Sequence, residues 1–134
     1  LLVGHELMRE DIPPLFGEEF NPGNWQSGHV VLNSKNIQIL LVTINKQGKV
    51  ESHQYKDDFI DELHFYWQSQ NSTSVESKRG QQIINHVKNK SRVYLFVRQH
   101  KLRGKKASPF VFHGEVQYKS HEGERPMNVI WELI

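Results

Sequence analysis

The side chains best suited to chemistry gather in one stretch near the middle of the chain, residues 64–86. The stretch contains aromatic rings, side-chain amides, hydroxyls and two adjacent cations. A ring can stack on an unstacked base, an amide can pair with a base edge through two hydrogen bonds, and the N–H groups that begin a helix can hold a phosphate. The candidate binding residues are Tyr66, Trp67, Gln68, Ser69, Gln70, Asn71, Ser72, Lys78 and Arg79. This combination predicts a site for a single-stranded or extruded nucleotide.

A structural interpretation of the same aromatic residues competes with this one. Successive strand residues point to opposite faces, so Trp67 shares a face with Phe65, and aromatic residues on strands are usually part of a core. The amides that follow are harder to bury, because an unpaired buried amide costs about 1–3 kcal/mol. A second Trp-Gln-Ser tripeptide, Trp25, Gln26 and Ser27, lies in a loop before a strand. Its tryptophan is either a lid over the core or a second stacking residue.

Positive charge is concentrated in the second half of the chain. Residues 1–62 carry five basic and ten acidic side chains, whereas residues 63–134 carry twelve basic and five acidic ones. A basic half is typical of a protein with a polyanionic partner. The densest patch is a loop that we expect to form a hairpin tip able to track phosphates; the alternative is a flexible, solvated loop. The cations of this patch are Arg98, Lys101, Arg103, Lys105 and Lys106.

Residues for catalysis or metal binding form no familiar signature in the sequence. There is no cysteine, and the eight histidines are not paired at strand or helix spacing, which argues against a metal site. Nucleophile elbows, Walker loops and dinucleotide-binding glycine motifs are also absent from the sequence. An acidic cluster at residues 57–62 leaves a metal-dependent nuclease as the least favoured alternative. We therefore expect a non-enzymatic domain that needs no cofactor.

The elements that must position these residues are mainly strands. Apolar alternation and short apolar runs bounded by turn residues predict strands at residues 30–32, 37–44, 49–55, 63–68, 92–98, 109–118 and 127–133. Thr73 followed by Glu76 matches a capping box and predicts one main helix over residues 74–89. Residues 1–28 are rich in proline and glycine, so we expect a loop-rich leader packed on the rest.

The close spacing of the strands favours antiparallel pairing, since parallel pairs need long crossovers. We therefore expect an α+β, β-rich fold, either a strongly bent antiparallel sheet or a small barrel. A length of 134 residues fits a single domain. The longest apolar run, residues 37–44, is too short to cross a membrane. The chain begins with Leu1 and lacks cysteine, so we expect a domain excised from a larger cytoplasmic protein.

Several segments resemble an uncharacterised bacterial domain family. They are FNPGNWQSGHVV, LLVTINKQGK, HQYKDDFIDELHFYWQSQNSTSVESKRGQQIINH, VYLFVR and FHGEVQYKSHEGERPMNVIWEL, and they cover nearly the whole chain from Gly17 onward. That family is commonly found C-terminal to superfamily-two DEAD/DEAH helicases with a phospholipase-D-type nuclease, and sometimes beside HNH nucleases. The resemblance implies a role in restriction or antiviral defence, with helicase and nuclease domains of the same polypeptide as partners. The strand order is also similar to that of PUA-like and SRA-like barrels, some of which flip modified bases, although a shared fold alone does not give function.

The resulting hypothesis is a DNA-binding accessory domain that recognises a modified, flipped base. In this hypothesis Trp67 or Trp25 stacks on the base, and the amides of residues 68, 70 and 71 read its edge. The residues expected to hold the DNA backbone are Lys78, Arg79, Arg98, Arg103, Lys105 and Lys106. The alternative is a protein-interaction module that docks on the helicase core through the apolar leader and the acidic first half.

Overall fold

The computed structural model describes residues 1–45 and 57–134, apart from the side chain of Asn45. The strands are β1 (Glu6–Leu7), β2 (His29–Leu32), β3 (Ile37–Asn45), β4 (Asp58–Phe59), β5 (His64–Gln68), β6 (Arg92–His100), β7 (Leu102–Arg103), β8 (Lys106–Ala107), β9 (Phe110–Glu122) and β10 (Asn128–Leu133). The α-helices are α1 (Pro22–Trp25) and α2 (Lys78–Ile84), and short 3-10 turns occupy Arg9–Asp11, Pro13–Phe16 and Asn33–Lys35. Six predicted strands are thereby confirmed as β2, β3, β5, β6, β9 and β10. The strand predicted at residues 49–55 lies outside the described residues.

Eight strands form one open sheet in the order β2-β3-β6-β9-β10-β5-β4, with β1 added on β9. All neighbours are antiparallel except β3 and β6, which run parallel. The predicted antiparallel sheet or closed barrel is therefore wrong, because the sheet is mixed and its terminal strands β2 and β4 do not pair within the described chain. The segment between β3 and β6 contains β4, β5 and α2, and it supplies the long crossover that a parallel pair needs.

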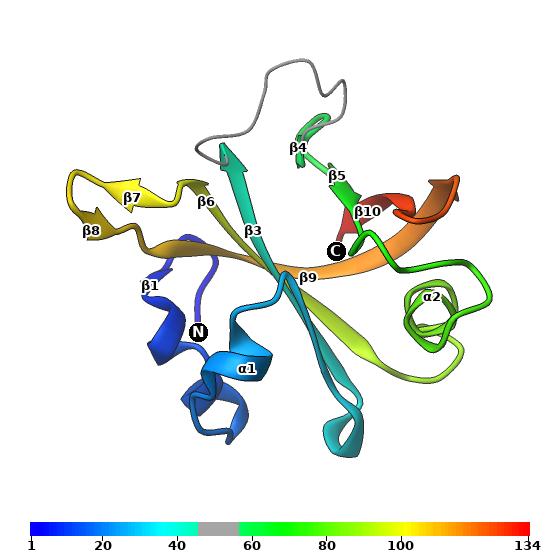
Figure 1. The fold of residues 1–134 in the computed structure, drawn as a ribbon, viewed down its shortest axis with the longest axis horizontal. Helices are drawn as coiled ribbons and strands as arrows, with labels where there is room; N and C mark the ends of the chain where they lie inside the picture. The colour runs from blue at the N-terminus through cyan, green and yellow to red at the C-terminus, as the bar shows by residue number, and fades with distance from the viewer. Residues whose placement is uncertain (46–56) are drawn as a thin grey trace.

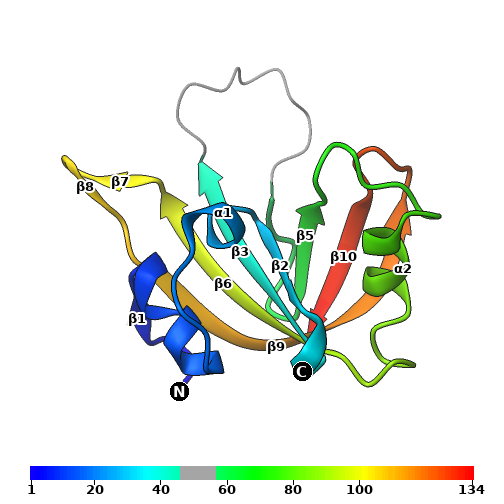
Figure 2. The ribbon, with the colours of Figure 1, turned by 60° about the horizontal axis from the view of Figure 1, so that its bottom comes forward.

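The open sheet curls because β9 is long and bent. Its first half pairs with β6 and its second half with β10. The pairing with β6 shifts register between Leu95 and Phe96, next to Gly114, whose φ is 93°. The pairing with β10 shifts between Ile130 and Trp131, and such irregularities bend and twist a strand. In Figures 1 and 2, β9 sweeps across the molecule and joins the side formed by β3 and β6 to the side formed by β5 and β10.

The inner face of the curl holds the larger hydrophobic core. Its buried members are Leu40, Val42, Ile44, Phe65, Trp67, Ile83, Val93, Leu95, Val97, Val116, Met127, Val129 and Trp131. Burying a large apolar side chain of this kind contributes about 1.5–3 kcal/mol. Ile83 comes from α2, so the helix covers one side of this core (Figure 2).

The leader covers the outer face of the sheet. Ile12 and Trp25 pack there with Phe96, Phe110 and other buried residues of β2, β3, β6 and β9. Both faces of β3 are therefore covered, which explains its nearly continuous apolar sequence. Packing of the leader against the aromatic and aliphatic side chains of this cluster holds residues 1–28 on the sheet, although these residues contain little regular structure.

Helix α2 is shorter than the helix predicted over residues 74–89. Ser77 is its N-cap, with the hydroxyl oxygen accepting a hydrogen bond from the Gly80 N–H at 3.1 Å. Thr73, the predicted N-cap, is instead buried, with 3% of its surface exposed, and it lies ahead of the turn that precedes the helix. A Cβ at Gly80 would collide with the carbonyl oxygen of Ser74, so the glycine lets that turn pack directly on the helix. Among the helices described, none has the length and apolar character needed to cross a bilayer.

Candidate nucleic-acid interface

The two Trp-Gln-Ser tripeptides, far apart in the sequence, contribute to one cavity of about 280 Å³ where β3 and β5 end. We call this cavity the amide pocket. It is lined by Arg9, Gln26, Gly28, Leu41, Val42, Thr43, Asp57, Trp67, Gln68, Ser69 and Gln70. Five residues that the sequence singled out for binding thus meet in space, because the curl of the sheet brings the end of β5 towards the loop that follows α1.

Both tryptophans of these tripeptides are buried, which leaves neither ring face open to a base. Trp25 is 2% exposed and Trp67 is 3% exposed. The Trp67 ring packs edge-on against His29 and Trp131, with centroid distances of 5.6 and 6.0 Å. Trp25 lies in the outer cluster beneath the leader. The burial of both rings argues against the predicted stacking role and favours the structural interpretation of these residues.

Gln68 is anchored on the sheet by its neighbours. Its backbone N–H donates to Asp57 Oδ1 at 2.7 Å, and its side-chain Nε2 donates to Asn128 Oδ1 at 3.0 Å. Asn128 Oδ1 also accepts the hydroxyl proton of Tyr66 at 2.7 Å. These bonds hold the Gln68 amide in place, so it can present a fixed oxygen to a ligand but cannot reorient freely.

The serines of the two tripeptides have structural roles. The Ser69 hydroxyl accepts a hydrogen bond from the Met127 N–H at 2.8 Å and donates to the Gln70 carbonyl at 3.1 Å. The Ser27 hydroxyl donates to the carbonyl of His29 at 3.0 Å. The remaining polar residues of the two segments are exposed, namely Gln26, Gln70, Asn71 and Ser72.

The cations predicted to hold a nucleic-acid backbone fall into two separate groups. Lys78 and Arg79 lie on α2, whereas Arg98 and Arg103 lie on β6 and β7, on the opposite side of the molecule in both views (Figures 1 and 2). The Arg79 guanidinium donates to the His29 carbonyl at 2.6 Å, and burial lowers its pKa. Arg79 therefore ties α2 to β2, while Lys78 remains exposed.

The β7–β8 hairpin carries exposed positive charge at the other end of the molecule. Its four cations, Lys101, Arg103, Lys105 and Lys106, are all exposed. Gly104 has a φ of 66°, which the tight tip requires and glycine adopts without strain. Residues 99–107 contain no acidic side chain. The predicted hairpin is confirmed, and it projects beyond the end of β6 (Figures 1 and 2).

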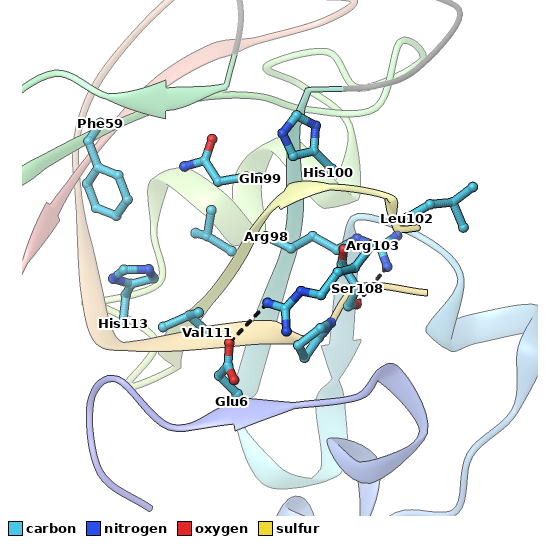
Figure 3. A pocket seen from close by; sticks show the side chains of 12 residues that line it. Glu6, Phe59, Arg98, Gln99, His100, Leu102, Arg103, Ser108, Val111 and His113 are labelled. Atoms are coloured by element: carbon cyan, nitrogen blue, oxygen red, sulfur yellow. Dashed lines mark hydrogen bonds and ion pairs between the residues drawn. The ribbon is translucent and has the colours of Figure 1, made fainter. Parts of the chain in front are cut away.

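A cavity of about 430 Å³ lies at the base of this hairpin (Figure 3). We call it the hairpin pocket. Strands β1, β4, β6 and β9 contribute to its walls together with the hairpin. The side chains with the most chemistry to offer there are Glu6, Phe59, Arg98, Gln99, Arg103 and His113.

Sequence reasoning identified two of these side chains, Arg98 and Arg103, and missed the rest. Phe59, Gln99 and His113 come from three different strands, so only the curl of the sheet makes them neighbours. The sequence did contain a signal for Gln99: alternation along β6 places this residue on the same face as Val97, which belongs to the core on the inner face of the sheet. The other two carry no local signal of a pocket.

The hairpin pocket has an aromatic wall. The rings of Phe59 and His113 lie 4.9 Å apart between centroids, with an interplanar angle of 59°. Behind them, the Phe59 ring contacts the buried Phe65 ring edge-on at 4.8 Å. Burial lowers the pKa of His113, so its imidazole is neutral at neutral pH and offers a ring face without a charge.

Arg98 brings a fixed charge to the floor of the hairpin pocket. Its Nε donates to Thr43 Oγ1 at 2.9 Å and its Nη1 to the Ser108 carbonyl at 3.3 Å. The guanidinium lies 4.4 Å from the centroid of the Phe110 ring, and Arg9 contacts the same ring at 5.1 Å. Burial and the charge of Arg9 lower the pKa of Arg98 to about 10, so Arg98 remains charged at neutral pH. Since Thr43 also lines the amide pocket, Arg98 and Thr43 connect the two cavities.

The acidic cluster at residues 57–62 stabilises turns. Asp58 Oδ1 accepts a hydrogen bond from the Phe59 N–H at 2.7 Å, and Asp61 Oδ1 accepts from the N–H groups of Leu63 and His64 at 2.9 Å. Within residues 1–45 and 57–134, no group of three His, Asp or Glu side chains is arranged to hold a metal ion. The nuclease alternative therefore gains no support from the described geometry.

Comparison with known families shows a match over nearly the whole chain. A family model described as a domain of unknown function, DUF3427, matches residues 1–133. No curated protein matches the sequence. The matched range includes the leader, both pockets and the hairpin, so all parts of the candidate interface lie within it.

Proposed function

The chain belongs to the DUF3427 family of domains of unknown function, and we propose that it is a DNA-binding accessory domain whose β7–β8 hairpin contacts the phosphate backbone. One observation carries this proposal: four exposed cations project on a hairpin beside a cavity of about 430 Å³. Cations that neutralise phosphates release condensed counterions, and this release drives binding to DNA. A two-stranded ribbon is also one of the shapes that fits the major groove.

The two cations that contact the Phe110 ring, buried Arg98 and partly buried Arg9, support the same proposal. Among the described residues, no carboxylate forms an ion pair with Arg98 or Arg9. Within the described part of the chain the charge of Arg98 is therefore not offset by an ion pair, and it adds to the positive potential around the hairpin. Potentials of this kind raise the rate at which a polyanion associates.

We extend the proposal to the setting that the resemblance implies. In that setting the domain is part of a cytoplasmic restriction or defence protein and reads DNA for the helicase and nuclease domains of the same polypeptide. Recognition of a modified or flipped base requires a pocket that can enclose the base. Two cavities support this extension. The hairpin pocket lies at the base of the hairpin, and the amide pocket lies beside the amide-rich segment.

Loss of the hairpin charge should weaken DNA binding. The variant Lys105→Ala/Lys106→Ala removes two exposed cations at the tip and should lower the affinity for duplex DNA at least about 10-fold at low salt. The matched control is Lys88→Ala/Lys119→Ala, which removes two exposed cations from the side of the molecule that carries α2. Fluorescence anisotropy with a labelled duplex measures both, and equal loss in the two variants would contradict a role for the hairpin.

A panel of DNA probes tests the finer proposal that a modification is read. Plain, methylated, hydroxymethylated and phosphorothioate duplexes of one sequence should differ in affinity if a pocket encloses the modified group. Equal affinity for all four would restrict the function to backbone binding. Failure of every probe to bind at low salt would overturn the proposal as a whole.

A second candidate function is docking on a protein partner, and exposed apolar side chains of the leader favour it. Those side chains are Leu1, Leu2, Val3, Leu15 and Phe20. Apolar docking depends little on salt, whereas phosphate contacts weaken steeply as salt rises. Salt-insensitive co-purification with the helicase domain, without any DNA affinity, would favour this candidate over DNA binding.

A further inference from the structure

The hairpin pocket has two chemically different ends. Figure 3 shows Phe59 and His113 together at one end, while Arg103 and Glu6 approach each other at the other end. Gln99 projects between Phe59 and the hairpin (Figure 3). An aromatic end beside a cationic end corresponds to the two parts of a nucleotide, its base and its phosphate.

The aromatic end is suited to stacking on a base. Phe59 and His113 are only partly buried, so ring surface remains available in the cavity. The Phe59 ring rests on the fully buried Phe65, which fixes its position before a ligand arrives. Stacking of a base on an aromatic side chain tolerates every base, because each base has a π-face.

Gln99 can supply the polar contact that stacking lacks. Its side chain is exposed at the pocket, and within the described part of the chain it has no hydrogen-bond partner. A free side-chain amide offers a donor and an acceptor side by side, the pattern that pairs with a base edge. This distinguishes Gln99 from Gln68, whose amide is already bonded to Asn128.

The cationic end holds a pair that an anion can displace. Arg103 Nη2 lies 3.4 Å from Glu6 Oε2, and the two side chains are 68% and 54% exposed. Exposed pairs of this kind contribute little, because solvent screens them. A phosphate binds a guanidinium through two parallel hydrogen bonds, so it competes well with Glu6.

We propose that the hairpin pocket binds one unstacked nucleotide, with its base against Phe59 and His113, its base edge on Gln99, and its phosphate on Arg103 in place of Glu6. This inference rests on the proposed DNA-binding function and assigns base recognition to the hairpin pocket. A volume of about 430 Å³ lies within the range of about 300–1,000 Å³ typical of small-molecule sites. The amide pocket is smaller, at about 280 Å³, and its tryptophan is only 3% exposed.

The nucleotide can belong to a nucleic-acid strand or be free in solution, and the choice of probes separates the two sources. The probes are a single-stranded oligodeoxynucleotide, the matching duplex, and free deoxynucleoside monophosphates. Saturable binding of a monophosphate with the same affinity as the oligonucleotide identifies a free nucleotide as the ligand. Much tighter binding of the oligonucleotide identifies a strand.

Glu6 gives the sharpest variant, because its removal should improve binding. Glu6→Gln deletes the competitor of the phosphate and should raise the affinity for the single-stranded probe by up to about fivefold. Glu122→Gln, an equal change of charge at the far end of β9, is the matched control and should leave the affinity unchanged. An affinity that is unchanged or lower for Glu6→Gln would overturn the proposed place of the phosphate.

Gln99→Ala and Phe59→Ala test the base end. Gln99 is exposed, so its truncation should leave folding intact while lowering the affinity for the single-stranded probe. Phe59→Ala should cost about 5- to 100-fold, and circular dichroism would establish whether that variant still folds. Side-chain NMR signals of Gln99 and the imidazole signals of His113 should shift on titration with the probe, while those of Gln68 stay in place.

The outcomes separate failure of this inference from failure of the proposed function. If the chain binds duplex DNA through the hairpin but the Gln99 and His113 signals do not respond to any probe, the pocket assignment alone is overturned. If the NMR signals of Gln68 and Gln70 shift instead, the base binds in the amide pocket, and the assignment to the hairpin pocket is again overturned. If no probe binds at low salt, both the inference and the proposed function fail.

Discussion

Arg98 is a buried cation that the fold stabilises by packing and hydrogen bonds. It is 8% exposed, and it lies over the Phe110 ring while donating to Thr43 and Ser108. A buried charge requires partners of this kind, because desolvation otherwise favours the neutral form. Arg98 therefore supports the junction of β3, β6 and β9 and at the same time places positive charge in the hairpin pocket.

Replacing Arg98 should reduce stability, unlike replacing its exposed neighbour on the hairpin. Hydrogen bonds to charged groups contribute about 1.5–3 kcal/mol, so Arg98→Met should lower the free energy of unfolding by about 2 kcal/mol. Arg103→Met, at an exposed position, should change it by less than about 0.5 kcal/mol. Urea denaturation measures both, and similar effects at the two positions would contradict the structural role of Arg98.

His29 makes stability dependent on pH. The ring is buried, its Nε2 donates to Gln38 Oε1 at 2.8 Å, and burial lowers its pKa to about 4. The unfolded chain takes up this proton near the ordinary histidine pKa of about 6.5, whereas the folded chain remains neutral until about pH 4. The stability is therefore fully present above pH 6.5 and is lost as the pH falls from there towards 4.

The expected loss is about 2 kcal/mol between pH 7 and pH 5, measured as the free energy of unfolding in urea. Burial also lowers the pKa values of His86 and His113, so these residues act in the same direction. An NMR titration of the folded chain identifies the contribution of His29 directly. A folded-state pKa near 6.5 for its imidazole would contradict the effect of burial.

At the scale of elements, α2 depends on a glycine that helix propensity alone would disfavour. Alanine is normally about 1 kcal/mol better than glycine in a helix. At position 80, however, the added Cβ would meet the carbonyl oxygens of Ser74 and Val75. Gly80→Ala should therefore lower the free energy of unfolding by about 1–3 kcal/mol, whereas Lys78→Ala on the exposed side should be neutral. A stabilised Gly80→Ala variant in thermal unfolding would contradict this packing.

Individual strands could be predicted from the sequence, but their pairing could not. The apolar runs and alternation that predicted β3, β6 and β10 depend on residues next to one another. The parallel pairing of β3 with β6 joins residues far apart in the chain, and nothing in either strand specifies its partner or direction. The helix was predicted too long for a related reason, because the periodic pattern does not reveal that the turn before Ser77 packs on Gly80.

Some residues of the candidate site could be predicted from the sequence, but their arrangement in space could not. The polar side chains of the two Trp-Gln-Ser segments were identified from their types, and four of them, Gln26, Gln68, Ser69 and Gln70, meet in the amide pocket. Whether a ring stacks or packs depends on which face of β5 turns inward, so the burial of Trp67 could not be derived from residue type. The aromatic wall formed by Phe59 and His113 arises from the bend of β9 next to Gly114, a property of the folded sheet.

In the whole molecule, side-chain contacts add to the backbone pairing through β9 in holding the two sides of the open sheet together. The His29 ring packs edge-on against Trp67, and Arg79 on α2 donates to the His29 carbonyl. Gln38 on β3 makes a second link to α2, because its side-chain amide donates to the carbonyl of Gln82. The curl is thus stable without closure into a barrel, and the strand ends near β3, β5 and β6 remain available to form cavities.

The charged side chains are distributed unevenly over the molecule. Exposed cations of the hairpin lie on one side of the molecule, and α2 with Lys78 lies on the other (Figures 1 and 2). If the hairpin alone holds the DNA backbone, few phosphates are contacted. This predicts a modest affinity for DNA and a shallow dependence of that affinity on salt. In our proposal the hairpin pocket then supplies any preference among bases.

The most direct test of backbone binding by the hairpin is the dependence of DNA affinity on salt concentration. Each phosphate contact contributes about −0.9 to the slope of log affinity against log salt. Removing Lys105 and Lys106 should therefore make the slope shallower by about 1.8 units, while the Lys88→Ala/Lys119→Ala control keeps the original slope. An identical slope for the hairpin variant and the unaltered chain would show that these cations do not touch DNA and would contradict the account.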